Sequence, residues 1–509
     1  MRQSHLIISN AAGMWLSQAL AIIPPLIMIP YLIGTIGEVG YGVYALTWSL
    51  IMSIDQLEKS LQSGVVKYSA AFLAQGAIDE VNKVVSSSFV YSIFLAIIIS
   101  ASVLLASIFY QDSSGELSML LIVVSVMLLF VLPLTPYVAL IQAKQRYFIN
   151  AFADTASKYI ILLIVIIWFS AITPSVEALI IITAVVLFFA RLIQVPLAYR
   201  LVPSLQNKIR LFNKGSFKLI FSFGAATVLI SVCLALNNTG IRWLMEYLAS
   251  ARFLAHFSII LLPVSLLWQI IGAVTMVLMP IASAYETQKN YILIEELLYR
   301  GIRWTVILLI ILLFVAVFLM KDVLILWVGK NYAFLAPYAL ALLVCVAFFQ
   351  STSSAHHILK GLGKLSAVFL IYFLGLVVVP IVVILLMSSF FKNSYFVATL
   401  GLCIGYVVCG LCQIIVSMRL IKLRVKDLIV NTYIYPILIA FVEYIVIIIV
   451  LKLFNIDGII SHTVTAIVAT VMFCVCCYMF IATQEEKRKF TELLNITKEK
   501  MKVVKIFFL

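Results

Sequence analysis

Apolar runs of 20 or more residues recur along the whole chain, and they restrict the fold more than any other feature. Each run is long enough to cross about 30 Å of hydrocarbon as an α-helix. Of the 509 residues, 64% are hydrophobic and 11% are charged, whereas about a quarter of the residues in a soluble domain are charged. The sequence therefore predicts an all-α, polytopic membrane protein.

About fourteen transmembrane helices are predicted, as two six-helix lobes plus two extra helices. Two turns six spans apart, LIQAKQRYF at 140–148 and ILKGLGKLS at 358–366, both carry paired basic residues, and parallel repeats of this kind hold a substrate site between the halves. The predicted division is 1–200 for the N-terminal lobe, 201–216 for a cytoplasmic linker, 217–421 for the C-terminal lobe, 428–483 for spans 13 and 14, and 484–509 for a basic cytoplasmic tail. The predicted spans are 6–33, 41–72, 84–110, 117–142, 149–171, 176–200, 217–239, 252–284, 297–320, 331–357, 364–388, 395–421, 428–452 and 460–483.

The position of the basic residues predicts the orientation. With the N-terminus in the cytoplasm, most of the 35 Lys and Arg residues fall at cytoplasmic ends of spans, as the positive-inside rule requires. We therefore expect a multi-pass, inner-membrane-type protein with both termini in the cytoplasm. The formal net charge of +14 then reflects anchoring and not nucleic-acid binding. The tail is expected to be an amphipathic helix on anionic membrane lipids, or alternatively a solvated charged helix.

The second predicted span carries charged residues where the bilayer centre is expected. Asp55, Glu58, Lys59 and Gln62 are spaced i, i+3, i+4 and i+7, so they form one stripe of a helix. Each charge exposed to lipid at that depth costs at least about 2.5–3.5 kcal/mol. The stripe is therefore predicted to line a polar cavity.

Two interpretations of this stripe remain open. In one, Asp55 and Lys59 neutralise each other and hold neighbouring spans together. In the other, Lys59 faces the cavity and meets an anionic headgroup, while Asp55 or Glu58 tunes it or exchanges a proton. The net charge of the three ionisable groups is negative, which weakens the idea that this stripe alone binds an anion.

Further polar residues in the spans are candidates for the same cavity. Arg191 could reach the cavity or extend toward the cytoplasmic interface. Asn237 and Asn238 could bind sugar hydroxyls or a neighbouring helix. Asp154 and Lys158, at i and i+4, are expected to be a structural pair. The candidates at the outer mouth of the C-terminal lobe are Arg242, Arg252 and His256, with pairing to Glu246 as the alternative for the two arginines.

Proline residues mark candidate bending points. Pro24, Pro25 and Pro30 lie in the first span, and Pro263 and Pro280 lie in the eighth. Proline removes a helix hydrogen bond and bends the helix, and neighbouring helices can satisfy the freed groups. These two spans are candidates for gating motions, although static kinks explain the same pattern.

The run PYLIGTIGEVGYGVYALTWSLIMSIDQLEKSL at 30–61 resembles the junction of spans one and two in bacterial O-antigen and polysaccharide repeat-unit flippases. This polysaccharide transporter family belongs to the multidrug/oligosaccharidyl-lipid/polysaccharide exporter superfamily. The chain departs from the family pattern at Asp55-Gln56-Leu57-Glu58, where Asp-x-Gly-Leu is usual.

The resemblance implies a transporter. It implies movement of a polyprenyl-pyrophosphate-linked oligosaccharide across the membrane for O-antigen, capsule or exopolysaccharide assembly, by alternating access. H⁺ and Na⁺ are the candidate coupling ions, no cofactor or metal is expected, and polysaccharide polymerases and chain-length proteins are candidate partners. A multidrug or cation antiporter of the same superfamily is the alternative.

The sequence contains no motif of a catalytic site. It has no P-loop, zinc-protease motif or nucleophile elbow, and no outer loop is long enough for a catalytic domain. We therefore expect a protein that is not an enzyme, and a membrane glycan polymerase is the least favoured alternative.

Overall fold

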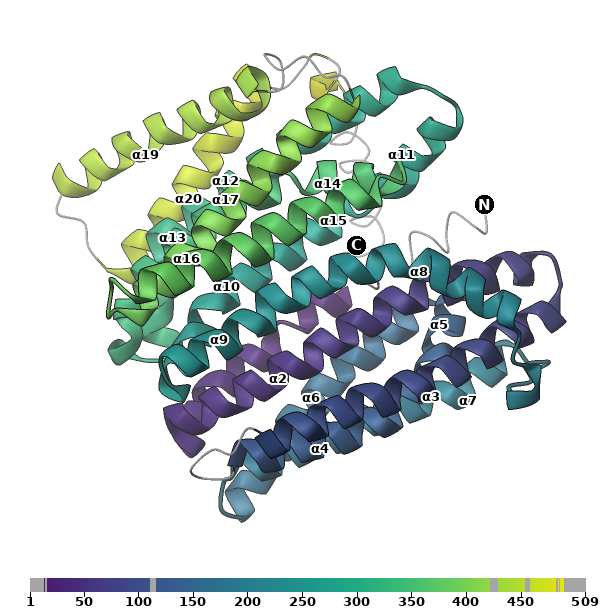
Figure 1. The fold of residues 1–509 in the computed structure, drawn as a ribbon. Helices are drawn as coiled ribbons and strands as arrows, with labels where there is room; N and C mark the ends of the chain where they lie inside the picture. Colours follow the sequence, from purple (N-terminus) through teal and green to yellow (C-terminus); the bar gives the residue numbers. More distant parts are fainter. Residues whose placement is uncertain are drawn as a thin grey trace, which may run out of the picture.

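The computed structural model is built of helices throughout its described part (Figure 1). It describes residues 13, 16–109, 116–421, 429–453, 458–481, 484 and 486–488. Thirteen helices in this part are long and apolar enough to cross a membrane. The predicted tail, 484–509, lies outside the described residues except at positions 484 and 486–488.

The first helix contains two predicted spans. Helix α2 (Ile23–Ala74) is interrupted at Gly37, where φ is +75°, a backbone conformation that glycine adopts readily. The chain reverses at Gly37, as contacts on either side of it show. Ser17 accepts a hydrogen bond from Thr155 at 3.1 Å, and Lys59 lies 3.9 Å from the neighbouring residue Asp154. We call residues 23–36 the first arm and residues 38–74 the second arm of α2. Counted as two, the arms raise the total to the predicted fourteen spans.

The remaining helices form two bundles and an added pair. Purple and blue helices form one bundle and teal to green helices the other, with the last two helices at the edge of the second (Figure 1). The first bundle contains α2, α3 (Ile78–Phe109), α4 (Glu116–Val131), α5 (Thr135–Ala143), α6 (Tyr147–Ala171) and α7 (Val176–Leu201). The second contains α8 (Lys214–Ala235), α9 (Ile241–Leu248), α10 (Ala251–Thr275), α11 (Leu278–Thr287), α12 (Tyr291–Trp327), α13 (Ala336–Ser351), α14 (Ser353–Gly361), α15 (Leu365–Tyr372), α16 (Val379–Ser388) and α17 (Ser394–Ile421); α19 (Tyr435–Leu453) and α20 (Ile459–Cys476) follow.

Short 3₁₀ and π-helical turns join several of these helices. A 3₁₀ turn at η1 (Leu132–Leu134) links α4 to α5, and η2 (Ile209–Leu211) and η4 (Lys330–Leu335) are 3₁₀ turns as well. The turns η3 (Leu236–Gly240) and η5 (Phe373–Val378) are π-helical, as are η6 (Val430–Ile434) and η7 (Cys477–Ile481). Because η3 continues α8 into α9, the seventh span extends to Leu248, beyond the predicted end at residue 239.

Only some of the predicted bending points coincide with breaks. Pro24 and Pro25 stand in the first turn of α2, directly after a break at 21–22. Pro30 and Pro263 lie inside α2 and α10. The predicted eighth span, 252–284, breaks at 276–277, and Pro280 belongs to the separate helix α11.

The second arm of α2 packs lengthwise against the second bundle. A Cβ on Gly42 would lie 1.9 Å from the backbone oxygen of Ala251, and one on Gly64 would lie 2.7 Å from that of Ile220. Small residues let helix backbones approach this closely. We call this contact the seam. Its residues on α2 are Gly42, Ala45, Ser49, Ser53, Ser60 and Gly64. Its residues on the second bundle are Ile220, Thr227, Ser231, Thr239, Arg242 and Ala251.

Candidate functional site

A cavity of about 310 Å³ lies between the two bundles. Both arms of α2 and helix α6 contribute from the first bundle, and η3, α9 and α10 contribute from the second. Its wall is mostly apolar and aromatic, with Tyr41, Tyr44 and Trp48 on the second arm. Its polar lining residues are Ser49, Lys158, Asn238, Arg242, Ser258, Ser265 and Gln269.

Arg242 is one of the two cations that line this cavity. It projects from α9, and its Nη1 donates to the carbonyl of Ala45 at 3.4 Å. Its Nε is buried without a hydrogen-bond partner, and no carboxylate lies within 4.0 Å among the described residues. A guanidinium with a buried, unpaired N–H is able to bind an anionic or hydroxyl group. This side chain faces the cavity and not Glu246, the partner that the sequence suggested.

A second cavity of about 150 Å³ adjoins the first inside the N-terminal bundle. Trp48, Met52, Lys158 and Ile161 line both cavities, so the two are adjacent. No ion pair joins Lys158 to Asp154 in the described part of the chain, which corrects the expected i, i+4 pair. Lys158 therefore provides a cation at the junction of the two cavities.

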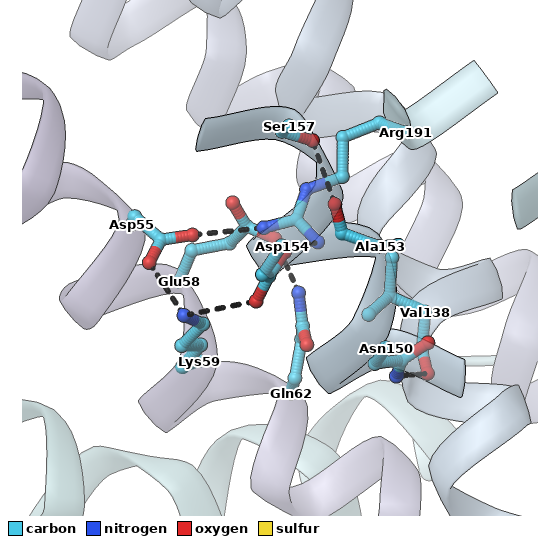
Figure 2. Close-up of polar contacts among 10 residues, drawn as sticks. All are labelled: Asp55, Glu58, Lys59, Gln62, Val138, Asn150, Ala153, Asp154, Ser157 and Arg191. Atoms are coloured by element: carbon cyan, nitrogen blue, oxygen red, sulfur yellow. Dashed lines mark hydrogen bonds and ion pairs between the residues drawn. The ribbon is translucent and has the colours of Figure 1, made fainter. Parts of the chain in front are cut away.

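The second cavity contains a network of four charged side chains from three helices (Figure 2). Lys59 lies 2.7 Å from Asp55 and 3.9 Å from Asp154. Arg191, on α7, lies 3.0 Å from Asp55 and 3.4 Å from Asp154. The network is balanced, with two cations and two carboxylates, so the expected Asp55–Lys59 pair is part of a larger structure.

The two cations differ in exposure. The side chain of Arg191 is 12% exposed, whereas that of Lys59 is 49% exposed. Arg191 is thus enclosed by its two carboxylates, and it extends neither to the interface nor freely into the cavity. Lys59 keeps an accessible face, and it is the member of this network that a ligand could reach.

The rest of the predicted stripe faces a different space. Glu58 accepts a hydrogen bond from Gln62, and both residues line an apolar cavity of about 360 Å³ between α2, α3 and α8. Glu58 also lines the second cavity. Asp55 lies about 25 Å along the second arm from Glu38, close to the 30 Å thickness of the hydrocarbon core.

The predicted asparagine pair is divided between two environments. The amide of Asn237 donates to the carbonyl of Leu376 at 2.9 Å and accepts from the hydroxyl of Tyr406 at 3.0 Å. Both contacts are within the C-terminal bundle, as expected for a residue that joins helices. Asn238, the next residue in the π-helical turn, is exposed and lines the main cavity. Wide turns of this kind often occur at functional positions.

Arg252 and His256 contact an acidic residue that the sequence did not identify. Arg252 Nε lies 3.0 Å from Glu38, and His256 Nε2 lies 3.3 Å from the same carboxylate. Glu38 follows Gly37 at the turn between the two arms of α2. These contacts therefore join the two bundles at the end of the seam nearest Gly37, and Glu38 is the partner of Arg252 in place of the expected Glu246.

Sequence reasoning missed Glu38, Asp154 and Lys158 as site residues. Asp154 and Lys158 carry the signal that could have identified them, because both are charged residues within an apolar span. Among the described residues, no group of three or more His, Cys, Asp or Glu side chains is arranged to bind a metal ion.

Comparison with known proteins identifies the fold. No family model and no curated protein matches the chain. A multidrug resistance MATE family transporter of the MOP superfamily is similar in its inward-facing conformation, with a TM-score of 0.61 and 12% identity over 81% of this chain and 94% of that one. An outward-facing conformation of such a transporter has a TM-score of 0.61 and 14% identity, over 82% of this chain and 95% of that one. A eukaryotic MATE transporter has a TM-score of 0.58 and 15% identity, over 83% of this chain and 95% of that one. At such low sequence identity, the TM-scores and coverage show a shared fold.

Proposed function

We propose that this chain, which has the fold of MATE transporters, moves an anionic lipid-linked oligosaccharide across the bacterial inner membrane by alternating access. The cargo is a polyprenyl-pyrophosphate-linked repeat unit for O-antigen, capsule or exopolysaccharide. One observation carries this proposal: Arg242 and Lys158 line the cavity between the bundles, and none of its described lining residues is Asp or Glu.

The charge of the cavity separates the two transporter hypotheses. A cationic drug requires carboxylates in its path, and those of Asp55 and Asp154 are balanced by Lys59 and Arg191. A pyrophosphate carries negative charge and suits guanidinium and ammonium donors. Tyr41, Tyr44 and Trp48 offer flat surfaces, and Asn238 and Gln269 offer amides to the sugars. Lys59 in the second cavity, Lys158 in both cavities and Arg242 in the main cavity then form a series of cations.

The seam restricts the path of the lipid tail. An isoprenoid chain stays in hydrocarbon while its headgroup occupies the cavity. The second arm of α2 contacts α8, η3 and α10 from Gly42 to Gly64, so a tail has no exit along that side. The opposite side of the cavity lies between the first arm of α2 and α10, with Pro24, Pro25 and Leu262 in its lining. We assign the tail to that side.

A multidrug antiporter is the second candidate, because the solved structures of this fold are multidrug resistance transporters. Under either function, H⁺ or Na⁺ is the proposed coupling ion. Anionic membrane lipids are proposed contacts of the basic loops. Polymerase and chain-length proteins are proposed partners of the flippase function, while the protein itself carries out no catalysis.

Gene deletion with lipid mass spectrometry tests the cargo. In the deletion strain we expect accumulated polyprenyl-pyrophosphate oligosaccharide and loss of surface polymer. Complementation with the wild-type chain or with Arg200→Gln, an exposed arginine at the end of α7, should restore both. Complementation with Arg242→Gln should not, at equal membrane abundance. Unchanged lipids and surface polymer in the deletion strain, together with efflux of cationic dyes by the purified protein in vesicles, would instead favour the antiporter.

A further inference from the structure

Glu38 is the centre of a polar cluster that joins the outer ends of the two bundles. Its carboxylate lies 3.0 Å from Arg252 Nε and 3.3 Å from His256 Nε2, and it accepts a hydrogen bond from the hydroxyl of Tyr332 at 2.7 Å. The three partners belong to α10 and η4 of the second bundle. Each of these contacts therefore crosses from the first bundle to the second.

The partners of Glu38 are held in position by their own bundle. His256 Nδ1 lies 2.6 Å from the hydroxyl of Tyr395 on α17. The imidazole also contacts the rings of Tyr332 and Phe334. His256 is 7% exposed, so its ring is fixed within the second bundle. Glu38 is thus a single side chain that inserts into a preformed receptor.

The inner end of the seam is held differently. Ser60 and Ser231 meet there through their hydroxyls, and Thr227 donates to the carbonyl of Ser60 at 3.3 Å. These hydroxyl contacts are neutral. The outer contact is charged, because the Glu38 carboxylate faces Arg252, which is cationic at any physiological pH.

We propose that Glu38 and its receptor of Arg252, His256 and Tyr332 form a latch that keeps the main cavity closed to the outer side. Without the carboxylate charge of Glu38, the attraction to Arg252 is lost and the outer ends of the two bundles are free to separate. Arg252 is 67% exposed, so its charge turns to water at little cost.

The proposal rests on the alternating access proposed above, but it does not depend on the cargo. Opening is measured by labelling Asn238→Cys in the main cavity with a membrane-impermeant maleimide, added outside intact cells. The parent for each comparison is the chain that carries only Asn238→Cys, and the wild-type chain corrects for its eight native cysteines. Glu38→Gln removes the charge with little change of shape. Glu177→Gln is the matched control, because this acid lies in the first turn of α7 and outside the cluster.

We expect Glu38→Gln to raise the labelling rate several-fold at pH 7.5, with Glu177→Gln at the parent rate. Equal rates for the parent and Glu38→Gln would overturn the latch.

A second measurement guards against a variant that fails to fold. Exchanging the two charges, with Glu38→Arg and Arg252→Glu in one chain, should slow Asn238→Cys labelling again relative to Glu38→Arg alone. Labelling of the exchanged chain as fast as that of Glu38→Arg alone would contradict the proposal. Labelling tests the latch, and lipid accumulation tests the cargo. A wrong cargo assignment would therefore leave the labelling result unchanged, and a wrong latch would leave the lipid result unchanged.

Discussion

The hydroxyl groups of Ser53 and Thr239 lie 2.6 Å apart across the interface of the two bundles. Thr239 also donates to the carbonyl of Ser49 at 2.7 Å, so the second arm of α2 and the π-helical turn η3 are joined midway along the seam. Any opening of the cavity toward one side has to pivot at, or break, this contact.

Gly42 provides the sharpest test of the seam. Gly42→Ala places a methyl group 1.9 Å from a backbone oxygen of Ala251, so α2 and α10 must separate. We expect a loss of about 1–3 kcal/mol in the free energy of unfolding, as for other overpacked sites. Gly34→Ala is the control, since nothing lies within 4 Å of the position that its methyl group would take. Melting of the purified proteins in detergent measures both, and equal midpoints would contradict the seam.

Arg191 should be required for stability because of its two carboxylates. Arg191→Met leaves Asp55 and Asp154 without their most enclosed partner, and breaking a buried pair in this way costs about 3–5 kcal/mol. Arg200→Met, on the same helix but exposed, should have little effect. Adding Asp154→Asn to Arg191→Met should recover part of the loss in a thermal-stability measurement. An Arg191→Met protein as stable as wild type would show that the network does not stabilise the fold.

Much of the fold, but less of the site, could be predicted from the sequence. Hydrophobic length identified the spans because each must cover the same thickness of lipid. Helical spacing correctly placed Asp55 and Lys59 on one face, since that relation is local. It could not reveal that Asp154 reaches Lys59 and Arg191 in place of Lys158, because those contacts depend on how three helices pack. Glu38 was missed for the same reason: its partners lie more than 200 residues further along the chain.

Lys59→Ala should slow transport while the protein inserts normally. Lys59 is the half-exposed member of the network, and loss of a charge-assisted contact costs about 1.5–3 kcal/mol, or roughly tenfold or more in affinity. Lys144→Ala, in the exposed turn after α5, serves as the control. Accumulation of the lipid-linked oligosaccharide in complemented cells is the readout. A Lys59→Ala chain that transports at the wild-type rate would exclude this lysine from the path.

The two adjacent asparagines should separate stability from transport. Asn237→Ala removes contacts to Leu376 and Tyr406, leaves buried groups unsatisfied and should cost about 1–3 kcal/mol of stability. Asn238→Ala changes a residue that faces the cavity, so its stability should stay within about 0.5 kcal/mol of wild type, with reduced transport. Reversed effects in melting and lipid-accumulation assays would show that the side chains are assigned to the wrong environments.

Beyond Gly37, the second arm of α2 runs to Ala74 without a further break in its backbone. Glu38 and Asp55 are therefore attached to one stiff rod, about 25 Å apart. If the end of this helix at Glu38 is released and moves, the part of the helix at Asp55 must move with it. The ion network around Asp55 would then register what happens at Glu38 without any relay of side chains between them, through the rigidity of a single helix.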